Sequence, residues 1–205
     1  MKINFKTNQW IAIAAIVQIV LLAVSQALRI GHLVVSNAIG LVSLFSIDLI
    51  NFLLLLYMTS VLSFLQEKTF IKSAFIVWII LGIVGGGIGL MSGELFGYIF
   101  WVIYGLLVFA ATIYLFIATL SIKNNCITFP YKLFSFGLLT LALLKMLIPI
   151  IFPLVTDIRT MRYHGLILQR KMENYADVIS LITPIAILIL VKNLNQIDQR
   201  TGHRK

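Results

Sequence analysis

Residues 41–65, LVSLFSIDLINFLLLLYMTSVLSFL, form a long apolar run that contains a single charged side chain, Asp48. About 20 helical residues are enough to cross the roughly 30 Å hydrocarbon layer of a membrane. The run lacks the two-residue alternation that is typical of a strand in a membrane barrel. Because lipid offers no water to the backbone, every polar backbone group must be satisfied internally. The run is therefore predicted to be a transmembrane helix.

Similar runs recur along the whole chain, with little polar sequence between them. Hydrophobic residues make up 60% of the 205 residues and charged residues 11%, whereas soluble proteins average about 45–50% and about 25%. We predict an all-α fold: one polytopic membrane helix bundle with six transmembrane helices. The predicted helices lie near 10–28, 41–65, 70–91, 97–120, 132–155 and 175–193, and an outer loop covers 156–174.

The distribution of Lys and Arg predicts how the bundle is oriented. The net charge is +9, but the basic residues are divided among short loops and tails, which argues against nucleic acid as a partner. Ten basic residues fall on the side of the termini and five on the other side. Since positive loops favour the cytoplasm, we expect a multi-pass cell membrane protein, on the bacterial inner-membrane pattern, with both termini cytoplasmic.

Four polar side chains at membrane depth are the main candidates for a ligand-binding site: Gln18, Asp48, Asn51 and Lys145. Ionisable groups inside a membrane are costly and often functional. Asp48 and Asn51 are three residues apart and share one helix face. Asp48 and Lys145 are predicted at depths that allow them to pair. The set indicates either an intramembrane polar pocket or an ion pair that only holds helices together.

The loop 156–174 is the longest polar segment and is predicted to lie outside the membrane. Ile158, Met161, Leu168 and Met172 follow a helical spacing, which favours an interfacial helix. Its cationic side is predicted to contact lipid headgroups or an anionic ligand. The residues proposed for this contact are Arg159, Arg162, His164, Arg170 and Lys171.

Glycines recur every four residues at Gly85, Gly89, Gly93 and Gly97. Small residues at this spacing let helix backbones approach closely in lipid. The pattern predicts a packing surface, through which a protein partner or a second copy of the chain could also bind. A flexible gate beside a substrate passage is the alternative interpretation.

The sequence offers little support for catalysis or for a bound cofactor. The stretch around Ser92, MSGELFG, superficially resembles the serine motif of rhomboid proteases, but Leu90 replaces a glycine and no histidine lies in a later helix. The histidines are far apart and lack ligand-like spacing, so no metal or haem is predicted. No phosphate-binding loop occurs. We therefore predict no cofactor and no metal.

Six helices, short loops and a length near 200 residues resemble the substrate-capturing subunits of energy-coupling-factor vitamin transporters. The alanines of the first helix, Ala12, Ala14, Ala15, Ala23 and Ala27, are similar to the alanine-rich surface with which those subunits dock onto their partner. Asp48 before the leucine run to Tyr57, together with Phe129-Pro130, also resembles an uncharacterised family of six-helix bacterial membrane proteins. The first resemblance implies substrate binding for transport, and the second implies no known activity.

Three functions remain open at this point. The chain could be a small-molecule-binding or transport subunit that uses Gln18, Asp48, Asn51 and Lys145. It could instead be a non-catalytic accessory, immunity or assembly protein, in which these residues only stabilise the bundle. The third alternative is a lipid-active enzyme that uses Asp157, Arg159, Arg162 and His164 at the outer interface.

Overall fold

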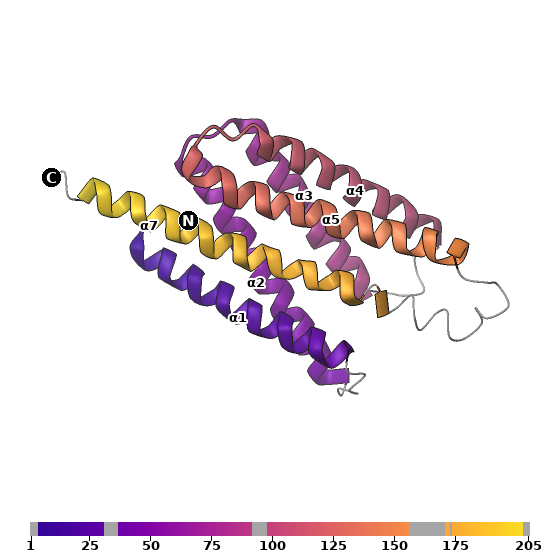
Figure 1. The fold of residues 1–205 in the computed structure, drawn as a ribbon. Coiled ribbons are helices and arrows are strands. Elements are labelled where there is room, and N and C mark those ends of the chain that lie inside the picture. Colours follow the sequence, from indigo (N-terminus) through magenta and orange to yellow (C-terminus); the bar gives the residue numbers. More distant parts are fainter. Residues whose placement is uncertain (1–3, 31–36, 92–97, 156–170, 173, 203–205) are drawn as a thin grey trace.

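The computed structural model describes residues 4–30, 37–91, 98–155, 171–172 and 174–202. These residues include six long α-helices and no strand, which confirms the predicted all-α fold (Figure 1). The elements are α1 Phe5–Ile30, α2 Asn37–Phe64, α3 Thr69–Met91, α4 Tyr98–Leu120, α5 Asn125–Val155, the 3₁₀ helix η2 Asp177–Leu181, and α7 Ile182–Gly202.

The helices form a closed ring in which each packs against its neighbour in sequence. The last helix, α7, packs against both α5 and α1 and so closes the ring. The beginning of α1 and the end of α7 lie at the same end of the bundle, here called the terminal end, and the opposite end is called the distal end (Figure 1). Phe5 and Gly202, the first and last helical residues described, therefore lie at one end of the bundle, as six antiparallel crossings require. That this side is cytoplasmic remains a prediction.

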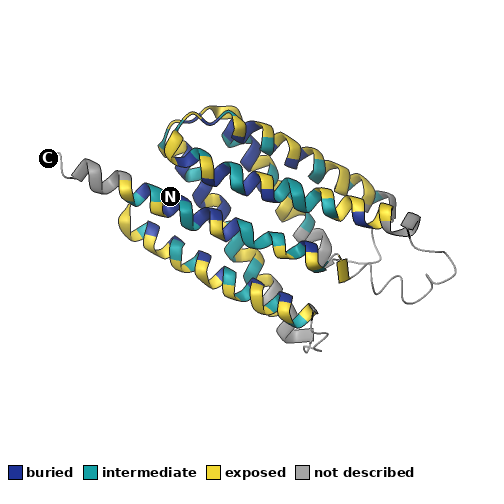
Figure 2. Ribbon diagram, viewed as in Figure 1, coloured by how far each residue is buried: buried dark blue, intermediate teal, exposed yellow. Residues whose placement is uncertain are grey.

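Length and apolarity make this an integral membrane protein. Among the described residues, five helices are long and apolar enough to cross a membrane: Phe5–Arg29, Phe45–Phe64, Val102–Leu120, Asn125–Ile151 and Asn174–Gln196. The helix α3 is apolar over Thr69–Gly85. Large apolar residues on every long helix remain exposed, as expected where lipid replaces water. Figure 2 shows exposed positions distributed along the helices.

The buried core is concentrated in the terminal half of the bundle. Phe75 of α3 stacks on Phe134 of α5 with 5.8 Å between ring centroids, and its edge meets Tyr131 at 5.4 Å. The Tyr131 hydroxyl donates to the Met58 carbonyl of α2 at 2.6 Å, across the ring. Because Phe75 and Tyr131 are almost fully buried, these contacts fill the space that the ring encloses.

A partly buried series of hydrogen bonds joins α1, α2 and α7 at the terminal end. The Tyr57 hydroxyl of α2 donates to Asn8 Oδ1 of α1 at 2.7 Å. The Asn8 Nδ2 group then donates to Asn195 Oδ1 of α7, also at 2.7 Å. Buried polar groups must be paired in this way to avoid a desolvation penalty. These hydrogen bonds therefore hold α1 against α7, where the ring of helices closes.

The helix α5 begins at Asn125, earlier than the predicted boundary at 132. The Asn124 side chain caps it by accepting the Cys126 N–H at 3.0 Å, which is the usual role of asparagine before a helix. Pro130 then lies inside the helix and cannot bond to the Cys126 carbonyl. The Asn193 amide of α7 donates to that carbonyl instead, at 2.7 Å. A neighbouring helix thus satisfies the acceptor that proline leaves free.

Gly85 brings α3 close to α4. The Tyr104 hydroxyl of α4 donates to the Leu81 carbonyl at 2.7 Å, and a Cβ atom at Gly85 would overlap this hydroxyl. At Gly85, the predicted glycine packing surface therefore packs against α4 of the same chain. Gly89 lies in α3, whereas Gly93 and Gly97 lie outside the described residues. A dimer through this surface remains a prediction.

Replacing Gly85 with alanine should displace Tyr104 and lower the free energy of unfolding by about 2 kcal/mol, through overpacking and the loss of one hydrogen bond. Thermal unfolding in a mild detergent would measure the change. Gly82→Ala is the matched control, because a Cβ there meets nothing within 4 Å. Equal effects of the two substitutions would contradict a specific close approach at Gly85.

Candidate functional site

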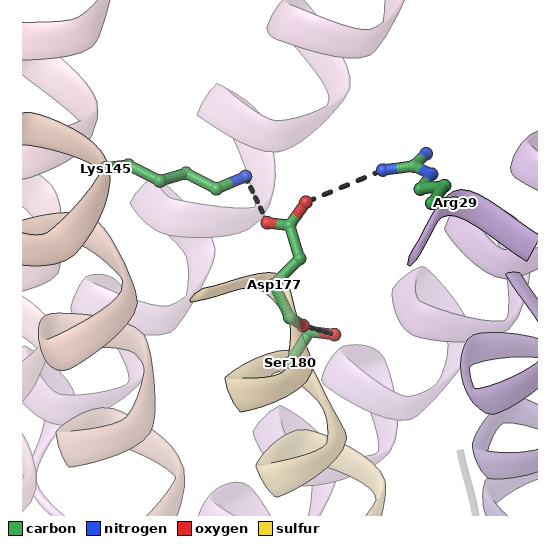
Figure 3. Close-up of polar contacts among 4 residues, drawn as sticks. All are labelled: Arg29, Lys145, Asp177 and Ser180. Atoms are coloured by element: carbon green, nitrogen blue, oxygen red, sulfur yellow. Dashed lines mark hydrogen bonds and ion pairs between the residues drawn. The ribbon is translucent and has the colours of Figure 1, made fainter. Parts of the chain in front are cut away.

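The distal half of the bundle contains an ion-pair cluster that joins three segments of the chain. Asp177, at the beginning of η2, forms two ion pairs (Figure 3). Its Oδ1 atom lies 2.7 Å from Lys145 Nζ of α5, and its Oδ2 atom lies 3.5 Å from Arg29 Nη1 of α1. The Asp177 side chain is 18% exposed, whereas those of Lys145 and Arg29 are 53% and 42% exposed. The carboxylate is thus the shielded centre of a cluster with a net charge of +1.

The 3₁₀ helix η2 places Asp177 where both cations can reach it. Pro184 has no N–H, so in a regular α-helix the Ser180 carbonyl would lose its partner. The chain is wound more tightly over Asp177–Leu181, and the Ser180 hydroxyl donates to the Asp177 carbonyl at 2.6 Å (Figure 3). Such 3₁₀ segments inside longer helices often mark strained or functional positions. The predicted sixth helix is therefore divided into η2 and α7.

These ion pairs correct the expected partner of Lys145. The sequence allowed Lys145 to pair with Asp48, but in the structure Lys145 pairs with Asp177. Asp48 lines a cavity between α2 and α3, whereas Lys145 lines another between α4 and α5. The predicted depths of Asp48 and Lys145 in the membrane were compatible with an ion pair between them. The order of the helices around the ring instead places Lys145 of α5 beside η2 and Asp177. The four predicted residues therefore do not form a single pocket.

Three of the four predicted residues nevertheless come together between α1, α2 and α3. Asp48 and Asn51 line a cavity of about 280 Å³ together with Phe52, Leu55, Trp78, Ile79, Gly82 and Ile83. Gln18 Nε2 donates to Asn51 Oδ1 at 3.4 Å. Gln18 is not among the lining residues and reaches the cavity through Asn51. The predicted common face of Asp48 and Asn51 is confirmed.

This group contains acceptors that the described chain leaves unused. Gln18 is 2% exposed, and its Oε1 atom has no hydrogen-bond partner among the described residues. Asp48 is exposed and takes part in no ion pair within this part of the chain. Buried polar atoms are usually paired. Gln26 Oε1 is likewise buried without a partner among the described residues, so the observation specific to this cavity is the Asp48 carboxylate without a counter-ion.

The second cavity, between α4 and α5, has a different chemical character. Its volume is about 610 Å³, and Lys145 is the charged member of an otherwise apolar lining. The lining residues are Val102, Gly105, Leu106, Val108, Phe109, Ala142, Lys145, Met146 and Pro149. Val102, Leu106 and Met146 are more than a third exposed, so the cavity is open to the surroundings of the bundle.

Neither Asp177 nor its ion pair with Arg29 was predicted from the sequence. Asp177 lies near the beginning of the predicted helix 175–193, and Arg29 directly follows the predicted helix 10–28. Both therefore lie near an end of a predicted helix, whereas Lys145 lies near the middle of the predicted helix 132–155. Predicted depth gave no signal for these contacts, which depend on which helices are neighbours.

The outer-loop candidates Arg159, Arg162, His164 and Arg170 lie outside the described residues, as does Asp157. Lys171 is described and is exposed. No group of three His, Cys, Asp or Glu side chains that could hold a metal ion occurs in the described ranges. Comparison with protein-family models, with curated proteins and with solved structures finds no match to this chain.

Proposed function

We propose that this integral membrane protein binds a small molecule carrying a cationic hydrogen-bond donor, such as a protonated amine, in the cavity between α2 and α3. The binding step is that of a small-molecule-binding or transport subunit. The observation that carries the proposal is a cavity lined by the carboxylate of Asp48 and by Asn51, whose side-chain oxygen is also bonded to the buried Gln18.

The charge of the site supports a cationic ligand. Asp48 lines the cavity, and both described ion pairs of the chain belong to Asp177 instead. A carboxylate at membrane depth without a counter-ion is costly. A protonated amine would compensate the charge and could also donate to an amide oxygen. The ligand would therefore be the counter-ion of Asp48, as Lys145 is the counter-ion of Asp177.

The size of the cavity supports a compact ligand. At about 280 Å³ it lies near the lower limit of ligand pockets, which range over roughly 300–1,000 Å³. Its remaining lining is apolar and aromatic, including Trp78 and Phe52. An aromatic face also attracts a cation. A small organic cation with an apolar part fits this combination of size and chemistry.

Asp48→Asn tests the proposal because it removes the charge and keeps the shape. Native mass spectrometry of the protein released gently from its own membrane would show whether a small cation is retained. In a parallel titration, short alkylamines are the probes and the corresponding alcohols are the controls. At 100 times its dissociation constant, an amine should stabilise the protein by about 2.7 kcal/mol. We expect Asp48→Asn to weaken amine binding at least about tenfold.

The stability of the ligand-free variant separates binding from a structural role. Asp48 has no ion-pair partner in the described chain, so Asp48→Asn should change the unliganded free energy of unfolding by less than about 0.5 kcal/mol. Ser60→Ala, on the same helix outside the cavity, is the control variant. Equal stabilisation by amines and alcohols, or undiminished binding by Asp48→Asn, would refute the proposal.

The second candidate is a non-catalytic accessory or assembly protein. The use of Arg29, Lys145 and Asp177 to join α1, α5 and η2 favours it, because these charges then have a purely structural purpose. It predicts a stoichiometric protein partner and no small molecule in the same native mass spectrum. The enzyme alternative depends on Asp157, Arg159, Arg162 and His164, which lie outside the described residues.

A further inference from the structure

We propose that the cavity between α4 and α5 is a binding site for one anionic phospholipid of the surrounding bilayer. In this arrangement an acyl chain occupies the apolar cavity and the phosphate pairs with Lys145. The site is separate from the cavity between α2 and α3, and the proposal does not depend on the function proposed there.

The lining of the cavity fits an acyl chain. Eight of its nine lining residues are apolar or glycine, and they come from one stretch of α4 and one of α5. Val102, Leu106 and Met146 are exposed to the surroundings, which in a membrane helix bundle are lipid. Apolar pockets of about 610 Å³ fall within the usual range for ligand sites, roughly 300–1,000 Å³. A lipid can enter such a cavity from the bilayer without crossing water.

The charge beside the cavity selects an anionic headgroup. Arg29 and Lys145 share one carboxylate, Asp177, so the cluster retains one positive charge. The Lys145 ammonium has three donors, and its side chain is 53% exposed although it is paired with Asp177. It can therefore donate to a phosphate oxygen while it keeps the Asp177 contact. An ammonium group donates strong, charge-assisted hydrogen bonds to phosphate oxygens.

Its depth also suits a headgroup. Lys145 lies within the apolar span Asn125–Ile151, close to the distal end of that span. A lysine in this position extends its ammonium toward the membrane interface. The phosphate would therefore lie at the level of the other headgroups while the acyl chain extends along α4 and α5. This geometry distinguishes a lipid from a free anion, which would leave the apolar cavity unfilled.

Native mass spectrometry of the full chain in detergent, titrated with phosphatidylglycerol or with phosphatidylcholine of identical acyl chains, tests the proposal. The wild type should retain one phosphatidylglycerol and bind it at least about tenfold more tightly than phosphatidylcholine. Both lipids carry the phosphate, but the choline ammonium cancels its charge and is repelled by the cationic cluster of Arg29 and Lys145. Lys145→Gln should remove this preference. Lys192→Gln, which removes an exposed cation of α7, is the control and should preserve it.

A second variant tests the acyl-chain part without altering any charge. A Cβ at Gly105 meets nothing within 4 Å, so Gly105→Leu can fill the cavity without a backbone clash. It should weaken binding of both lipids without lowering the thermal unfolding temperature of the lipid-free protein, because replacing a glycine inside α4 favours the helix. Equal affinity of the wild type for the two lipids would overturn the proposal. Undiminished binding by Gly105→Leu would overturn it as well, and would indicate headgroup contacts elsewhere on the surface.

Discussion

Phe75→Ala is expected to lower the free energy of unfolding by about 4 kcal/mol, because removing a buried phenyl ring costs both its contacts and the cavity that remains. Phe75 is 1% exposed and contacts Tyr131 and Phe134. These residues connect α3 to α5 across the inside of the ring. Neither helix is the neighbour of the other along the ring, and without Phe75 the Trp78–Phe134 contact at 6.4 Å is the aromatic contact between them that remains among the described residues.

Reversible unfolding in mixed detergent micelles would measure this effect. Phe136→Ala is the matched control, because Phe136 lies on α5 close to Phe134 but is 57% exposed. We expect the control to lose less than about 1 kcal/mol, since lipid or detergent replaces the contacts of the ring. Similar losses for the two variants would show that the bundle lacks a specifically packed interior.

Asp177→Asn is expected to lower the free energy of unfolding by about 2 kcal/mol, since it leaves Lys145 and Arg29 without a counter-ion at membrane depth. The estimate lies below the cost of breaking a fully buried pair because both cations are about half exposed, which weakens each interaction. Thermal unfolding in lipid nanodiscs would measure the loss.

A double-mutant cycle separates the ion pair from other effects of the substitution. Lys145→Met and Asp177→Asn together should cost less than the sum of the two single changes, because both single changes remove the same 2.7 Å ion pair. Lys145→Met leaves Asp177 with the longer contact to Arg29. Lys192→Met provides a control for the removal of an exposed cation. Strict additivity of the two changes would show that the contact contributes nothing to stability.

The helices themselves could be predicted from sequence because apolar length reports directly on membrane spanning. The helix boundaries were harder to predict from sequence. The helix α5 begins at Asn125, before the predicted boundary at 132. Asn124 caps it there, and Asn193 bonds to the carbonyl that Pro130 leaves free. The cap residue is visible in the sequence, but the compensating contact comes from α7. Such a contact depends on which helices are neighbours, and apolar runs do not contain that information.

The candidate site was predicted in part for the same physical reason. Asp48 and Asn51 are one helical turn apart, so helix geometry alone places them on one face. The pairing of Lys145 depends on position around the ring. Predicted depth was compatible with Asp48, whereas the contacts of α5 with α7 and η2 place Lys145 beside Asp177. Sequence thus identified Lys145 and Asp48 but not Asp177, and the fold determined which polar residues are partners.

Closure of the ring by the final helix has a consequence for biosynthesis. As the chain leaves the ribosome, α1 to α5 enter the membrane before the segment that carries Asp177. During that interval Arg29 and Lys145 have no carboxylate between them, and the faces of α1 and α5 that will contact α7 remain open. A nascent chain that stops before η2 is therefore an unfinished bundle with exposed charge, a form that membrane chaperones and quality-control proteases can distinguish from the complete protein.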